Sequence, residues 1–146
     1  MALIYKEVLI KASASLVWDA VRDVGAVHTR LAPGVVDDTQ LEEGARTVTF
    51  ANGMVVRELI VDICDERRRL AYASVGGQTT HHNSSIQVFP DGDTSARLVW
   101  ITDVLPNDLA GPIGSLVELG SAAMKCTLEG LADHGRQLHP AERDAP

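Results

Sequence analysis

The segment that decides the fold is DLAGPIGSLVELGSAAMKCTLEGLADHGRQL, residues 108–138. Its apolar residues recur at helical spacing, which predicts one amphipathic helix with a single buried face. These residues are Ile113, Leu116, Val117, Ala123, Met124, Leu128 and Leu131. Pro112 falls in the first turn, where a helix tolerates proline because the first N–H groups have no partner within the helix. A helix of about 26 residues measures about 39 Å, so it can cross the whole face of a sheet.

The chain that precedes this helix predicts a sheet and two short helices. Residues 2–10 alternate as a strand, residues 14–24 follow helical spacing, and residues 26–32 favour a second short helical turn. Ser13 or Ser15 is the expected N-cap of the first helix. Six further strands with short turns between them predict an antiparallel meander. Their ranges are 35–43, 45–51, 54–64, 69–75, 80–89 and 95–105.

These elements predict an α+β domain in which the long helix covers one face of a curved sheet. A strongly curved sheet around one helix seldom fills completely with small aliphatic side chains, so we expect a cavity between them. We predict a single ligand-binding domain over residues 1–138. The polar, proline-bounded residues 139–146 are expected to form a flexible tail.

Composition and motifs exclude several classes of function. A net charge of −7 argues against nucleic-acid binding, which needs a basic face. No apolar run reaches the length of a membrane-spanning helix, so we predict no membrane insertion. Cys64 and Cys126 share no metal-ligand spacing, and without a signal peptide we expect both to be reduced thiols, in apolar surroundings, of a cytoplasmic protein. The sequence has no nucleophile-elbow, zinc-protease or phosphate-loop motif, and it implies no metal and no cofactor.

Three segments together resemble the START-like (SRPBCC) superfamily, and most closely its bacterial polyketide cyclase/dehydrase-like proteins. They are VWDAVRDVGAV (17–27) with LAPGV (31–35), VRELIVDICDERRRLAY (56–72), and SSIQVFPDGDTSARLVWITDVLP (84–106). The resemblance covers residues 3–137. It implies the helix-grip fold, a curved seven-stranded antiparallel sheet around a long C-terminal helix, with two short helices between the first two strands. It also implies a cavity for a hydrophobic ligand, but no particular reaction, because fold alone does not fix function.

Two adjacent histidines, His81 and His82, lie in the predicted strand 80–89. Neighbouring strand residues point to opposite faces, so this pair cannot chelate one metal ion from inside the sheet. His82 shares its face with Ser84 and the apolar residues that follow it, which makes it the inward histidine. We predict that Thr80, His82 and Ser84 line the cavity mouth. Whether His82 is only a hydrogen-bonded wall residue, contacts a ligand or transfers a proton stays open.

Arg57 and Glu58 are two charged neighbours inside an otherwise apolar strand. Alternation with Val55, Val61 and Ile63 would place Arg57 inside, where it would bind a carboxylate or phosphate group. The family resemblance instead favours Glu58, which could serve as a general acid or base if buried. The sequence leaves both alternatives open.

The strand 95–105 and the long helix supply the remaining predicted cavity residues. Trp100 and Thr102 lie on one strand face, and we expect Met124 and Leu128 on the helix to face them. Methionine suits a pocket that adapts to its ligand.

The leading functional hypothesis is a protein, monomeric or homodimeric, that binds a small hydrophobic molecule of aromatic, polyketide-like or lipid-like character. One alternative is a cyclase/dehydratase-like enzyme that moves a proton with His82, either alone or together with Glu58. The other is a regulatory interaction module whose entrance is reordered by a ligand.

Overall fold

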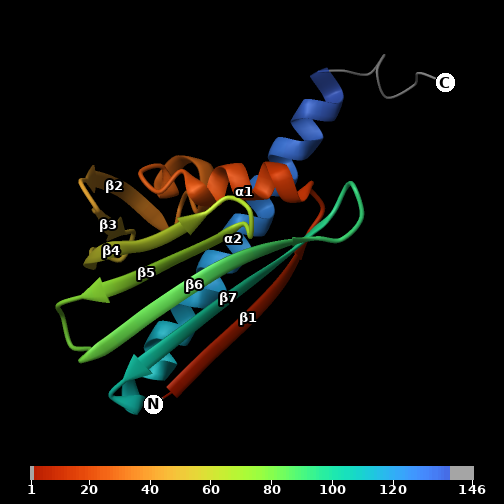
Figure 1. Cartoon of the computed structure of the whole chain (residues 1–146). Coiled ribbons are helices and arrows are strands. Elements are labelled where there is room, and N and C mark those ends of the chain that lie inside the picture. The colour runs from red at the N-terminus through yellow and green to blue at the C-terminus, as the bar shows by residue number, and fades with distance from the viewer. Residues whose placement is uncertain (1, 139–146) are drawn as a thin grey trace.

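A seven-stranded antiparallel sheet curves around one long helix in the computed structural model, which describes residues 2–138 (Figure 1). The spatial order of the strands is β1-β7-β6-β5-β4-β3-β2. Their bounds are β1 Ala2–Ile10, β2 Val36–Glu42, β3 Ala45–Phe50, β4 Val55–Cys64, β5 Arg69–Val75, β6 His81–Pro90 and β7 Ala96–Leu105. The predicted helix-grip architecture is confirmed. The first strand lies beside the last, with Ala2 opposite Val104.

The long helix α2 (Ala110–Leu138) follows a short 3₁₀ turn, η2 (Asn107–Leu109). It has 29 residues, slightly more than predicted, and Pro112 lies in its first turn as expected. Val117, Met124 and Leu128 are buried against the sheet and the short helices. Leu131, predicted to share that face, is 46% exposed, so its assignment to the core was wrong.

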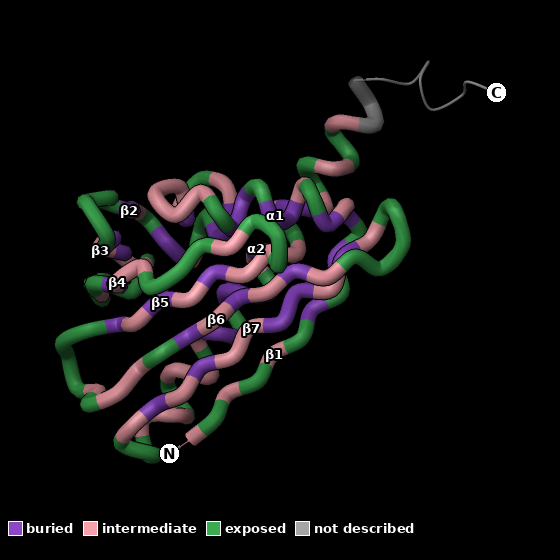
Figure 2. The backbone as a smooth tube through the Cα atoms, in the orientation of Figure 1, coloured by how far each residue is buried: buried purple, intermediate pink, exposed green. Residues whose placement is uncertain are grey.

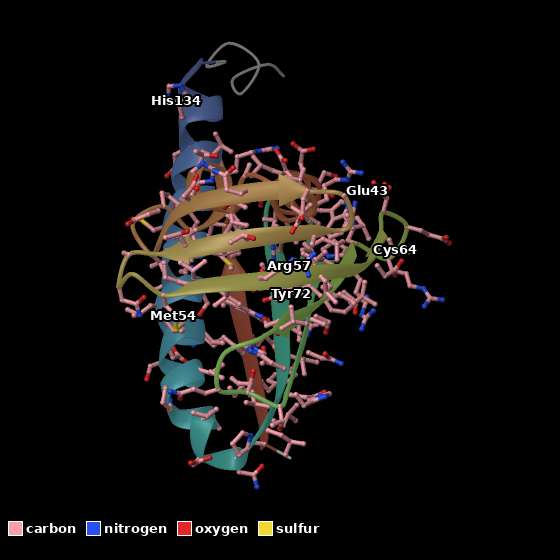
Figure 3. All side chains as sticks on the ribbon, turned by 90° about the vertical axis from the view of Figure 1, so that its left-hand side faces the viewer. Glu43, Met54, Arg57, Cys64, Tyr72 and His134 are labelled. Atoms are coloured by element: carbon pink, nitrogen blue, oxygen red, sulfur yellow. The ribbon has the colours of Figure 1, made fainter. Side chains whose placement is uncertain are left out.

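The C-terminal part of α2 extends beyond the sheet (Figures 1 and 2), which agrees with the exposure of Leu131 near this end of the helix. Figure 3 shows His134 on this projecting part of the helix. The predicted flexible tail, residues 139–146, lies outside the described residues.

Two short helical segments separate β1 from β2. α1 (Ala14–Arg22) is capped by Ser13, whose hydroxyl accepts a hydrogen bond from the Leu16 N–H at 3.2 Å. A π-helical turn, η1 (Val27–Leu31), follows it. The Trp18 indole is buried and donates to an Asp65 carboxylate oxygen at 2.9 Å, which ties α1 to the turn between β4 and β5.

The core lies between the concave face of the sheet and the helices. Its fully buried side chains include Ile10, Leu70, Ile86, Leu98 and Leu128. Gly120 lets α2 approach β7 closely, since a Cβ at that position would lie 3.2 Å from the Trp100 ring. The cavity begins where this packing ends.

Candidate functional site

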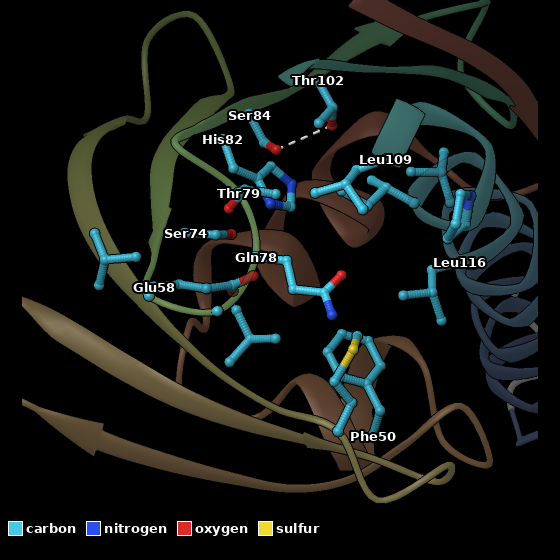
Figure 4. A pocket seen from close by; sticks show the side chains of 18 of the residues that line it. Phe50, Glu58, Ser74, Gln78, Thr79, His82, Ser84, Thr102, Leu109 and Leu116 are labelled. Carbon is cyan, nitrogen blue, oxygen red and sulfur yellow. Dashed lines mark hydrogen bonds between the residues drawn. The ribbon is translucent and has the colours of Figure 1, made fainter. Parts of the chain in front are cut away.

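A cavity of about 430 Å³ lies between the concave face of the sheet and the N-terminal part of α2. Its volume falls within the range of about 300–1,000 Å³ that is typical of small-molecule sites. One wall is apolar and is formed by η2 and α2, including Leu109, Ile113 and Leu116 (Figure 4). Phe50 and Met54, from the β3–β4 hairpin, close another side.

The opposite wall is a band of polar side chains on neighbouring strands, namely Glu58, Ser74, His82, Ser84 and Thr102 (Figure 4). The strand register places Glu58 opposite Ser74 and Ser84 opposite Thr102. The hydroxyls of Ser84 and Thr102 are 2.9 Å apart and satisfy one another. A mostly apolar cavity with one polar band can both bury a hydrophobic molecule and orient it.

His82 lines this cavity, as its position in the strand predicted, and it is half-buried. Burial lowers the pKa of its imidazole below the usual value of 6.5, and the neighbouring His81 lowers it further. The ring is therefore neutral at physiological pH. No hydrogen bond joins His82 to Glu58 among residues 2–138.

The depressed pKa of His82 predicts that the protein loses stability as the pH falls. A folded-state pKa below the unfolded one means that protons bind the unfolded chain more readily. The stability that the neutral His82 contributes to the folded protein is fully present above its ordinary pKa of 6.5. It is lost as the pH falls through the lower pKa that His82 has in the folded protein. Urea unfolding at about pH 7.5 and about pH 5.5 should show a smaller loss for His82→Gln than for wild type. The exposed His134→Gln variant is the control, and equal losses in His82→Gln and wild type would contradict the assignment.

Of the two charged neighbours on β4, Glu58 faces the cavity and Arg57 does not. Glu58 is 7% exposed and lines the cavity. Arg57 lies on the outer face of β4, where its Nε donates to Glu42 Oε1 at 2.9 Å. The alternative that Arg57 faces the cavity was therefore wrong. The error arose because Val55 and Val61, which lie on the same face of β4 as Arg57, are themselves exposed. The alternation of apolar residues in this strand therefore did not mark the core.

A buried arginine that the sequence analysis missed forms an ion pair with Glu58. Arg46 Nε donates to Glu58 Oε1 at 2.7 Å, and the two side chains are 5% and 10% exposed. The guanidinium lies over the Tyr72 ring at 4.9 Å and also donates to the Val24 carbonyl at 3.3 Å. Arg46 and Glu58 are direct cross-strand partners on β3 and β4. The sequence held one sign that Arg46 is buried, because the apolar Val48 lies two residues away on the same strand face.

Two further predicted cavity residues are placed elsewhere. Thr80 is exposed and precedes β6, so the strand alternation does not extend to it, and Thr79 lines the cavity instead. Leu128 is completely buried in the core and contributes nothing to the cavity wall, because it lies about three turns beyond the cavity part of α2. Both assignments were wrong.

Trp100 and Met124 line a smaller space of about 50 Å³ that adjoins the main cavity. Trp100 also lines the main cavity, whereas Met124 does not. The two spaces share Glu58, Tyr72 and Leu116. Met124 and Trp100 therefore share this smaller space, but the assignment of Met124 to the ligand cavity was wrong.

Within the described part of the chain, no group of three or more His, Cys, Asp or Glu residues is arranged to hold a metal ion. Cys64 is half-buried and Cys126 is exposed, and both are free thiols. Cys126 thus lacks the apolar surroundings expected for it. Over residues 2–138, no helix has the length and apolar character needed to cross a membrane.

Comparison with known proteins agrees with this architecture. Residues 1–136 match the family described as polyketide cyclase / dehydrase and lipid transport. No curated protein matches the sequence.

Three solved structures illustrate the shared fold. The protein XoxI from Bacillus cereus has a TM-score of 0.80 at 18% identity, over 90% of this chain and 98% of that one. A protein from Thermobifida fusca has a TM-score of 0.72 at 24% identity, over 95% of this chain and 96% of that one. A norcoclaurine synthase point mutant from Thalictrum flavum, in complex with a transition state analogue, has a TM-score of 0.65 at 22% identity, over 92% and 96%. At these identities the likeness concerns the fold alone.

Proposed function

We propose that this chain, which belongs to the polyketide cyclase / dehydrase and lipid transport family, binds a small hydrophobic molecule between its sheet and α2. The ligand is of aromatic, polyketide-like or lipid-like character. The observation that carries the proposal is the cavity of about 430 Å³, which apolar side chains line on most sides. Burial of apolar ligand surface supplies the affinity, and the polar band supplies the orientation.

The contacts of Glu58 favour binding without catalysis. Proton transfer by Glu58 would require its carboxylate to be free to contact the substrate. Glu58 is instead bonded to Arg46 at 2.7 Å, an arrangement that holds its charge in place. His82 then acts as a neutral hydrogen-bonding group of the wall.

Filling the cavity should abolish ligand binding. Leu116 is half-buried and lines the cavity, so Leu116→Trp places a larger side chain in the ligand's space. A panel of aromatic and lipid-like compounds is screened by the shift in melting temperature. A compound at a hundredfold excess over its Kd should stabilise wild type by about 2.7 kcal/mol, and this stabilisation should disappear in Leu116→Trp.

Leu119→Trp is the matched control, since Leu119 is on the same helix but is 58% exposed and outside the cavity. It should retain the full ligand-induced shift. A shift that survives in Leu116→Trp would mean that the compound binds elsewhere, and the proposal would fail. The absence of any shift across the panel in wild type would count against it too.

A further inference from the structure

Two buried side-chain atoms in residues 2–138 have no hydrogen-bond partner, and both belong to residues that line the same cavity. They are the Ser74 hydroxyl oxygen and the Trp100 indole nitrogen. Ser74 is only 9% exposed. Buried polar groups are nearly always hydrogen-bonded, because leaving one unpaired forfeits its hydration without replacement. Each atom exposes less than 1 Å² of surface, so a ligand in the cavity can bond to it only when an adjoining side chain shifts.

The neighbouring protein groups do not fill this role. Glu58 lies opposite Ser74 in the strand register, yet the hydrogen bond of its carboxylate is with Arg46. Ser84 is already paired with Thr102. The Trp100 N–H lies near the Tyr72 hydroxyl and lowers its pKa, against the larger opposing effect of burial, but the contact lacks hydrogen-bond geometry. Among the described residues the Ser74 hydroxyl therefore has no protein partner, and the Trp100 N–H has none beyond this contact with Tyr72.

The charges around the cavity favour an uncharged ligand. Among the described residues that line it there is no lysine or arginine, and the one acidic side chain, Glu58, is paired with Arg46. An anionic head group would be buried beside that carboxylate with no free cation to pair with it. A buried, unpaired charge costs far more than a buried polar group.

We propose that the ligand is an uncharged, mainly apolar molecule with hydroxyl or carbonyl oxygens that hydrogen-bond to Ser74 and Trp100. Fatty acids and other carboxylates are rejected. This inference rests on the proposed function and narrows its ligand class from hydrophobic molecules in general to neutral oxygenated ones. A carbonyl oxygen accepts from either side chain, and a hydroxyl can also donate to Ser74.

A naphthyl series tests this proposal with probes that share one apolar skeleton. Equilibrium dialysis measures the Kd of naphthalene, 2-naphthol, 2-acetylnaphthalene and 2-naphthoate at neutral pH. Each hydrogen bond to a buried group should tighten binding by up to about tenfold. We therefore expect 2-naphthol and 2-acetylnaphthalene to bind about tenfold more tightly than naphthalene, and 2-naphthoate to bind more weakly than naphthalene.

Two variants test whether the tighter binding of the oxygenated probes depends on the Ser74 hydroxyl and the Trp100 N–H. Ser74→Ala removes the hydroxyl, and Trp100→Phe removes the indole N–H while keeping an aromatic ring. At least one should reduce the preference for the oxygenated probes, measured as the ratio of their Kd values to the Kd of naphthalene in the same variant. Ser85→Ala, a serine on β6 outside the cavity, should keep the wild-type preference.

The outcomes separate this inference from the proposed function. Equal binding of naphthalene and the oxygenated probes would overturn the inference and leave the hydrophobic site intact. So would the tightest binding by 2-naphthoate, or an oxygenated-probe advantage that survives in both variants. Failure of the whole series to bind wild type would count against the proposed function itself.

Discussion

Arg46→Ala is expected to lower the free energy of unfolding by about 3–5 kcal/mol. The variant leaves Glu58 as a buried carboxylate whose only ion-pair partner, among the described residues, has gone. Exposures of 5% and 10% for the two side chains mean that water replaces little of the lost interaction. The variant also removes the cation–π contact with Tyr72 and the hydrogen bond to the Val24 carbonyl. Urea unfolding followed by circular dichroism measures the loss.

Replacing both Arg46 and Glu58 shows whether the instability of Arg46→Ala comes from the unpaired Glu58 carboxylate or from the loss of packing. A buried ion pair often contributes little relative to apolar residues of similar size, because its desolvation offsets its attraction. Arg46→Met combined with Glu58→Leu should therefore cost much less than Arg46→Ala alone. A double variant as unstable as the single one would show that the ion pair itself stabilises the sheet.

Arg57→Ala is the matched control on the adjacent strand. Arg57 and Glu42 also form an arginine–carboxylate pair at 2.9 Å, but their side chains are 48% and 53% exposed. Exposed pairs contribute about 0–1 kcal/mol. The two arginines should thus differ several-fold in effect although their N···O distances are nearly the same.

Leu128→Ala should have the second large effect, a loss of about 2–5 kcal/mol in the free energy of unfolding. Leu128 is completely buried, and truncation removes apolar contacts and leaves a void between α2 and the core. Because Leu128 lies outside the ligand cavity, the Kd of any ligand found should not change, provided that the protein is still folded at the assay temperature.

Leu131→Ala provides the comparison three residues further along the same helix. Its 46% exposure predicts a loss within about 0.5 kcal/mol. Similar losses at the two positions would mean that the C-terminal part of α2 packs against something in solution, contrary to the structure. The urea unfolding midpoints of Leu128→Ala and Leu131→Ala, measured in parallel with wild type, give the two losses.

The fold could be predicted because two periodicities ran through nearly the whole sequence. Alternation marked the strands, turn residues marked their ends, and helical spacing marked α2. Leu131 shows the limit of the second signal, because spacing reports which side of a helix is apolar but not where its partner sheet ends.

The polar contacts of the site were harder to predict because they depend on which strands are neighbours. Arg46 and Glu58 are twelve residues apart, and each alone looks like a charge that should face solvent. Only the β3–β4 register shows that they neutralise one another. Arg57 was misjudged because β4 exposes valines on its outer face, which reverses the usual meaning of apolar alternation.

The position of β1 beside β7 has a consequence for synthesis on the ribosome. Residues 2 and 104 are paired, so the first strand finds its partner only after about a hundred more residues have emerged. At about 5–20 residues per second this interval is roughly 5–20 s. Until then Ile10 and the rest of its apolar face are exposed, and β2 to β6 can pair only with one another. The nascent chain therefore depends on late closure of the sheet, which makes β1 the segment that a chaperone would have to shield longest.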